Sequence, residues 1–137
     1  KEKYTPPKNS YANLDFSIQY GSGACTGKYY KDSITFDGLS RQGLVGAAEQ
    51  VSGEALMESQ FSGIFGLAFR PLLTSSAKTA KEIPNPEWME LLNGGNKPRI
   101  MGFYLHKDCS HMTFGGIDNT DYSGELRYIP LSHKTYW

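Results

Sequence analysis

The sequence has few cysteines, no long hydrophobic run and no excess of charge of either sign. Its two cysteines, Cys25 and Cys109, allow one disulfide but do not require it, which excludes a framework of several disulfides. No apolar run approaches the ~20 residues that a transmembrane helix needs, so we expect no membrane span. The 14 basic residues balance 14 acidic ones, which argues against nucleic acid or an anionic membrane as a partner.

The chain also has no initiator methionine and no recognisable signal peptide at its start. Residues 1–13 are polar and contain prolines, which predicts a loop-like lead-in. We therefore expect a mature, processed or truncated chain. Its 137 residues are enough to bury a sizeable core within one domain.

A glycine-rich hairpin is the clearest element in the sequence. Apolar and polar side chains alternate along Phe16–Tyr20, as in a strand with two different faces. Closely spaced glycines follow Tyr20, and a second strand-forming run extends to Phe36. The pattern predicts a hairpin over about residues 14–36. Its flexible tip, Gly21-Ser22-Gly23, begins beside an aromatic hydroxyl.

The remainder of the chain predicts mainly β structure with one or two short helices. Asp37-Gly38 is a tight-turn signal, and the apolar, glycine-rich run Phe61–Phe69 predicts a fully buried strand packed closely at its glycines. Asn85 is expected to cap a helix that has Pro86 at its first position. The other predicted elements are a strand over 42–51, a short helical turn over 53–60, a loop over 70–85, a helix that buries Trp88, Leu91 and Leu92 and ends at Gly94-Gly95, and strands within about 100–131 (100–105, 112–118 and 125–131).

Three glycine-containing motifs share their order and spacing with one known family. They are Tyr20-Gly21-Ser22-Gly23, then Phe61-Ser62-Gly63-Ile64-Phe65-Gly66-Leu67, then Phe114-Gly115-Gly116-Ile117-Asp118 with Tyr122 and Tyr136-Trp137. Together they resemble the flap, the Phe-Asp-Gly-Ile-Leu-Gly-Leu segment and the Phe-Gly-Gly-Ile-Asp…Tyr-Trp segment of the pepsin-like aspartic proteases. The likeness covers nearly the whole chain, and the combination is much more specific than any single motif.

The resemblance implies a mainly β, pepsin-like acid protease fold, of which residues 1–137 form part: one lobe and the crossing into the second. It also implies an aspartic-type endopeptidase, in which two aspartates, each in an Asp-Thr/Ser-Gly turn, hold the attacking water. This chain has no such turn, and Asp32-Ser33-Ile34 comes nearest. We therefore expect the catalytic aspartates upstream of Lys1 and downstream of Trp137. We assign no catalytic residue here and expect the chain to be inactive in isolation.

The resemblance further implies where substrate binds and which partners the chain has. The matching positions are the flap residues Tyr20, Gly21, Ser22 and Gly23, and the apolar pocket residues Phe61 and Ile64. The flap would close as a lid over an extended polypeptide substrate. The other implied partners are the upstream and downstream segments of the protease, and no metal or other cofactor is expected. The implied location is the secretory pathway, either extracellular or a lysosome-like or vacuole-like compartment.

Rival interpretations are weaker. Four side chains of the types that bind zinc lie near one another in the sequence, but in a predicted hairpin loop without a second ligand pair at fixed spacing: His106, Asp108, Cys109 and His111. The Gly21-Ser22-Gly23 tip lacks the spacing of a phosphate-binding loop and the Gly-x-Ser-x-Gly of a serine hydrolase. The remaining alternative is a catalytically inactive pepsin-like protein that binds peptides or serves as an antigen. Flanking sequence with or without two Asp-Thr/Ser-Gly turns would discriminate between the two functions.

Overall fold

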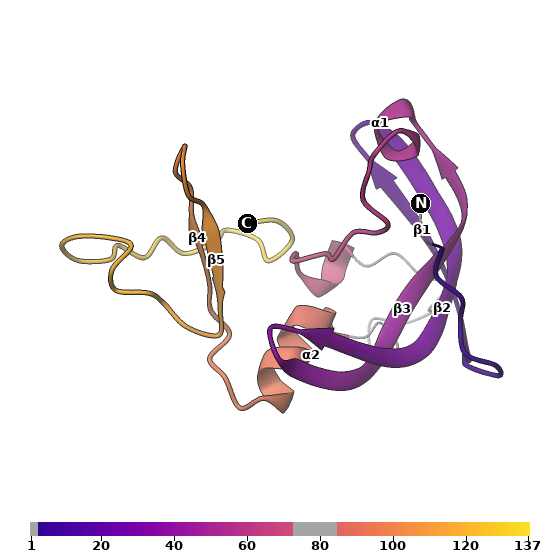
Figure 1. Ribbon diagram of the computed structural model, residues 1–137, viewed down its shortest axis with the longest axis horizontal. Helices are drawn as coiled ribbons and strands as arrows, with labels where there is room; N and C mark the ends of the chain where they lie inside the picture. The colour runs from indigo at the N-terminus through magenta and orange to yellow at the C-terminus, as the bar shows by residue number, and fades with distance from the viewer. Residues whose placement is uncertain (1–2, 73–84) are drawn as a thin grey trace.

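Antiparallel strands make up most of the regular structure (Figure 1). The computed structural model describes residues 3–72 and 85–137. Its elements are β1 Tyr11–Tyr20, β2 Gly23–Phe36, β3 Leu39–Ser52, α1 Glu54–Met57, the 3-10 helix η1 Arg70–Leu72, α2 Glu87–Gly94, β4 Met101–Tyr104 and β5 His111–Phe114. The strands form one three-stranded sheet in the order β1-β2-β3 and a separate two-stranded sheet of β4 and β5. This architecture confirms the predicted mainly β class with one or two short helices; the described residues contain two short α-helices.

Two tight turns set the register of the three-stranded sheet. Tyr20 pairs with Gly23 across the β1–β2 turn, so the alternation along Phe16–Tyr20 does mark a strand of a hairpin. Phe36 pairs with Leu39 across the β2–β3 turn. The two residues between them, Asp37 and Gly38, have φ of 50° and 73°. A two-residue turn with positive φ at both positions matches the right-handed twist of the flanking strands, which explains the Asp-Gly pair.

The buried side chains form one cluster on the sheet and another on α2. Phe16 and Tyr29 are 7% and 9% exposed, and their ring centroids lie 5.1 Å apart. Trp88, Leu91 and Leu92 are at most 1% exposed, which confirms the helical face predicted from their spacing. Burial of these large apolar side chains supplies the main favourable free energy of folding.

A carboxylate at the start of α2 attaches the helix to β3. Glu87 accepts a hydrogen bond from the Leu44 backbone N–H at 2.7 Å and forms an ion pair with Arg41. Asn85 does not cap the helix as predicted: its side chain accepts from Arg70 and donates to Glu90 at 2.6 Å. Helix formation begins one residue later than expected, at Glu87, because the Asn85 amide pairs with the side chains of Arg70 and Glu90 and not with the first backbone N–H groups of the helix.

The predicted buried strand over residues 61–69 is wrong. The segment has no regular structure, and Phe61, Ile64 and Phe65 are all exposed. A strand needs a neighbour for its backbone N–H and C=O groups, and none of the described strands pairs with this segment. The expected close packing at its glycines is also missing, because a Cβ at Gly63 or Gly66 would meet no atom within 4 Å.

The predicted strand over residues 125–131 is wrong for the same reason. Tyr128 and Ile129 are 82% and 87% exposed, and the segment is irregular. The chain end instead folds back toward α2, where the ring of Trp137 lies 5.9 Å from that of Trp88. The Trp137 indole N–H donates to the Leu67 carbonyl at 2.7 Å. Most of the loop predicted over residues 70–85 lies outside the described residues.

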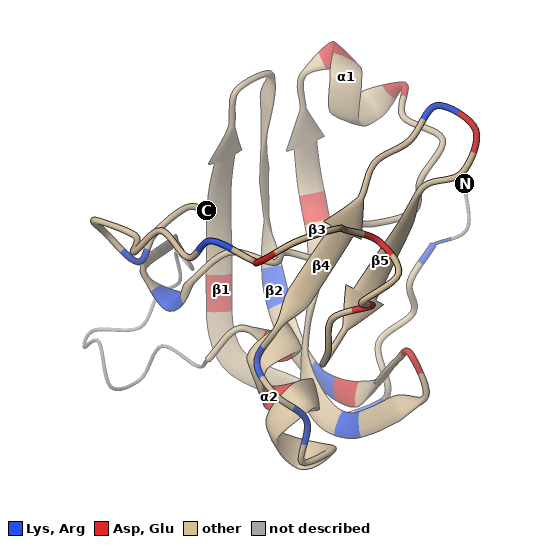
Figure 2. Cartoon of the chain, turned by 90° about the vertical axis from the view of Figure 1, so that its left-hand side faces the viewer, with Lys and Arg blue, Asp and Glu red and all other residues tan. Residues whose placement is uncertain are grey.

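Acidic and basic residues are interspersed along the chain rather than gathered by sign (Figure 2). The sequence has equal numbers of acidic and basic residues, so neither sign dominates the chain as a whole. Among the described helices, none combines the length and apolar character that crossing a membrane requires.

Candidate functional site

The candidate site begins at the turn between β1 and β2, where Gly21 and Ser22 connect the paired residues Tyr20 and Gly23. The Gln19 side-chain amide donates to the Tyr20 carbonyl at 2.9 Å and to the Gly23 carbonyl at 3.0 Å. The Gln19 side chain, which comes from β1, therefore links the two residues at the base of the turn. Sequence reasoning missed this role, although a long amide side chain two residues before a glycine turn is a signal that could have suggested it.

Tyr20 is half-buried at the base of the turn. Burial raises the pKa of its hydroxyl, and the nearby Cys25 raises it further. The hydroxyl therefore stays protonated over the whole physiological pH range and can donate a hydrogen bond to an acceptor such as a peptide carbonyl.

The disulfide that the two cysteines would allow is not formed: Cys25 and Cys109 are both free thiols.

The tip of the hairpin rests on the end of β3 and the start of α1. A Cβ at Gly23 would collide with the Ser52 carbonyl, and a Cβ at Gly53 would collide with the Ser22 carbonyl. Gly53 also has φ of 94°, a conformation that favours glycine. Figure 1 shows α1 and the β1–β2 turn at the same end of the sheet. These backbone contacts position the tip.

Phe61 and Ile64 lie outside this turn, on the irregular segment that follows α1. They are 51% and 53% exposed, so their apolar surfaces are available to a ligand. The segment then reaches the other end of the hairpin, where Phe65 stacks on Phe36 with ring centroids 5.0 Å apart. The structure thus brings the four predicted tip residues together and puts the two predicted pocket residues on a neighbouring open segment.

The contact between Gly53 and the tip gives a matched pair of substitutions. Gly53→Ala is expected to lower the free energy of unfolding by about 1–3 kcal/mol, because φ is positive and the new methyl group would collide with the Ser22 carbonyl. Gly21→Ala is the control, because its Cβ would meet nothing within 4 Å. Urea denaturation measures both; equal stability of the two variants would refute the proposed support of the tip.

The zinc-type ligands near residue 108 do not form one cluster. His106 lies 3.8 Å from the Asp108 carboxylate, whereas His111 pairs with Asp121 at 2.9 Å. His106 and Asp108 lie on the loop between β4 and β5, whereas His111 is the first residue of β5 and pairs with an aspartate from the loop after that strand.

The sequence and fold are similar to those of aspartic proteases. A model of the eukaryotic aspartyl protease family matches residues 1–137. Cathepsin D of Dictyostelium discoideum is 36% identical over 128 residues, which cover 90% of this chain and 32% of the relative. Gastricsin of Rattus norvegicus is 29% identical over 98% of this chain and 35% of its own length.

The structure matches that of the aspartic proteinase from Irpex lacteus with a TM-score of 0.69 and 25% identity, over 90% of this chain and 38% of that one. The chain spans about a third of the length of the curated relatives it matches. The family match extends over the whole chain and agrees with the three sequence motifs. This chain belongs to the eukaryotic aspartyl protease family.

Proposed function

We propose that this chain supplies the lid and part of the substrate-binding wall of an aspartic endopeptidase. The observation that carries the proposal is the glycine turn at the end of a long hairpin, with the protonated hydroxyl of Tyr20 at its base. Family membership supports a protease in general. The roles of lid and substrate-binding wall go beyond family membership and are what we propose for this chain.

The tip has the groups that would bind an extended polypeptide. Gly21 and Ser22 are exposed, so the backbone groups of the turn and the Ser22 hydroxyl can exchange water for a peptide backbone. The exposed apolar side chains of Phe61 and Ile64 would contact a substrate side chain. Closing the tip over the bound peptide would exclude water and hold the scissile bond in one orientation.

The catalytic groups would come from the remainder of the protease. Two aspartates that share a proton would hold the attacking water, one accepting its proton while the other donates to the peptide carbonyl. This chain would orient the substrate and shield the reaction from solvent. Alone it would bind weakly and cleave nothing. We also propose that the intact protein lies in the secretory pathway, extracellular or in a lysosome-like or vacuole-like compartment, and its likeness to cathepsin D and gastricsin supports this.

The test compares the intact protein, with its flanking segments, against the 137-residue chain. The intact protein is expected to cleave an unfolded polypeptide at acid pH and to be inhibited by pepstatin, while the chain alone shows no cleavage. Absence of cleavage by an intact protein that binds the same polypeptide would favour the catalytically inactive, peptide-binding alternative. Pepstatin-sensitive cleavage by the isolated chain would refute the division of roles proposed here.

A further inference from the structure

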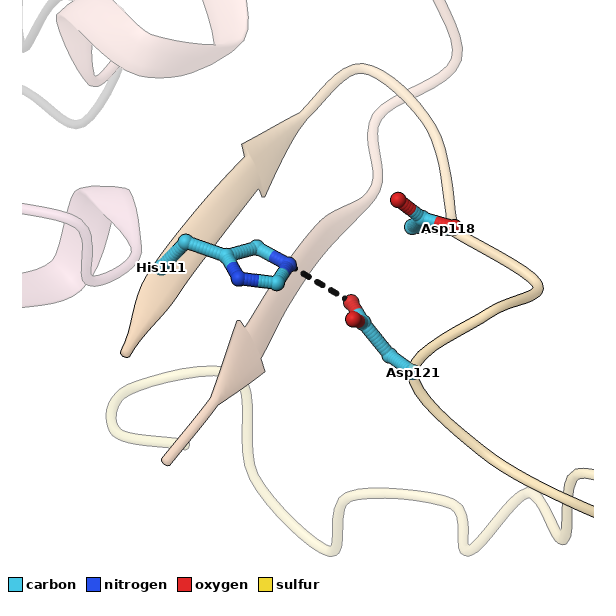
Figure 3. Close-up of side chains that lie close together, drawn as sticks. All are labelled: His111, Asp118 and Asp121. Carbon is cyan, nitrogen blue, oxygen red and sulfur yellow. Dashed lines mark hydrogen bonds and ion pairs between the residues drawn. The ribbon is translucent and has the colours of Figure 1, made fainter. Parts of the chain in front are cut away.

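Three metal-ligating side chains converge beside the β4–β5 hairpin (Figure 3). His111 is the first residue of β5, and Asp118 and Asp121 lie on the loop that follows this strand. One ligand atom from each of the three lies within 4.8 Å of the other two. The cluster shares no residue with the proposed lid and substrate-binding wall.

Neighbouring residues orient two of these ligands. The His111 ring stacks on Tyr104, its partner across the β4–β5 ladder, with centroids 5.2 Å apart. Asp118 Oδ1 accepts hydrogen bonds from the backbone N–H and the hydroxyl of Thr120, at 2.8 and 2.7 Å.

The third ligand already faces the histidine. Asp121 Oδ2 lies 2.9 Å from His111 Nε2, and Figure 3 shows both aspartates on the side of the imidazole that carries this nitrogen. The Asp121 and His111 side chains are 20% and 40% exposed, so an ion could reach the cluster from solvent. An ion pair between these two residues would involve only one of the carboxylates.

We propose that His111, Asp118 and Asp121 form a Zn²⁺ site. One imidazole nitrogen and two carboxylates are a ligand set that zinc accepts, and the two negative charges would neutralise the ion. Magnesium and calcium prefer oxygen ligands alone, so the histidine favours a transition metal. Zinc–ligand bonds of about 2.1 Å place tetrahedral ligand atoms about 3.4 Å apart, so small side-chain movements would complete the site.

A bound ion would connect the loop after β5 to the first residue of that strand. Three protein ligands leave one tetrahedral position to a water molecule. Because zinc would bind this folded arrangement and not the dispersed ligands of the unfolded chain, it is expected to raise the unfolding temperature. The site therefore predicts a metal-dependent stabilisation as well as binding.

Asp118 is the residue that distinguishes a metal site from an ion pair. Asp118→Asn keeps an oxygen that can accept both Thr120 hydrogen bonds but removes the negative charge. An ion pair between His111 and Asp121 would be nearly unaffected by this change. A zinc site would lose one of its three protein ligands, at a cost of at least about tenfold in affinity.

The experiment titrates Zn²⁺ into the full 137-residue chain by calorimetry at neutral pH, with Co²⁺ absorption as a second readout of coordination. The parent carries Cys25→Ser and Cys109→Ser, because free thiolates would compete for the metal. We expect one Zn²⁺ per chain and an intense Co²⁺ spectrum typical of four-coordination. Asp118→Asn and His111→Gln are each expected to weaken binding at least about tenfold.

The matched control is the double substitution His106→Gln and Asp108→Asn, which removes the other histidine–aspartate pair of the hairpin region. Binding should be unchanged in this control. No binding in the parent, undiminished binding by Asp118→Asn, or loss confined to the control would each overturn the site. Circular dichroism without metal checks folding. If His111→Gln fails to fold, Asp118→Asn decides the outcome.

Discussion

Replacing Trp88 with alanine is expected to lower the free energy of unfolding by about 3–5 kcal/mol. The Trp88 side chain is 1% exposed, and its indole N–H donates to the Ala68 carbonyl at 2.9 Å. Its ring contacts those of Phe69 and Trp137, with centroids 6.2 and 5.9 Å away. The substitution would leave a large cavity between α2 and the returning chain end and would also remove a hydrogen bond.

Urea denaturation, followed by far-UV circular dichroism, measures this loss. Trp137→Ala is the matched control, because this second tryptophan is 65% exposed although it touches the same cluster. Trp137→Ala should lower the free energy of unfolding by less than half as much as Trp88→Ala, since less of the Trp137 surface is buried in the folded protein. Equal costs would contradict the assignment of Trp88 as the centre of the α2 core.

The second large effect concerns the proposed lid. In the intact protease, Tyr20→Ala is expected to lower kcat/KM for a polypeptide substrate by about 100-fold, because a poorly placed lid leaves the substrate misoriented and hydrated. Tyr20→Phe should lose about tenfold, since it keeps the ring and removes only the hydroxyl hydrogen bond. Steady-state kinetics at acid pH measure both variants, and the difference between them assigns the effect to the ring or to the hydroxyl.

Tyr11→Ala is the control for this experiment. Tyr11 begins the same strand, β1, at the end remote from the tip, and its ring contacts Tyr30 at 5.9 Å. Removing it should leave kcat/KM within about twofold of the parent, because surface substitutions far from a site have small effects. A similar loss in Tyr11→Ala and Tyr20→Ala would mean that both act through stability, and an unchanged Tyr20→Ala would show that the tip does not close on substrate.

Elements governed by neighbours in the sequence could be predicted well. The alternation along Phe16–Tyr20, the Asp37-Gly38 turn and the helical face of Trp88 depend on local periodicity and backbone preference. The position of the turn at Gly21 and Ser22 belongs to this group, because a glycine turn after an alternating strand is a local pattern, whereas the lid role of its residues stays a prediction. The family motifs extended the prediction to the fold class.

Elements that need a distant partner could not be predicted in this way. The run Phe61–Phe69 is apolar enough for a buried strand, yet it is irregular because no described strand pairs with it. Local sequence also carries no sign that Gly53 would support the Ser22 carbonyl, or that Asp118 and Asp121 would turn back toward His111. Strand pairing, backbone contact and ligand convergence each join residues separated along the chain. Periodicity specifies which face a side chain occupies, but only the folded path specifies what it meets there.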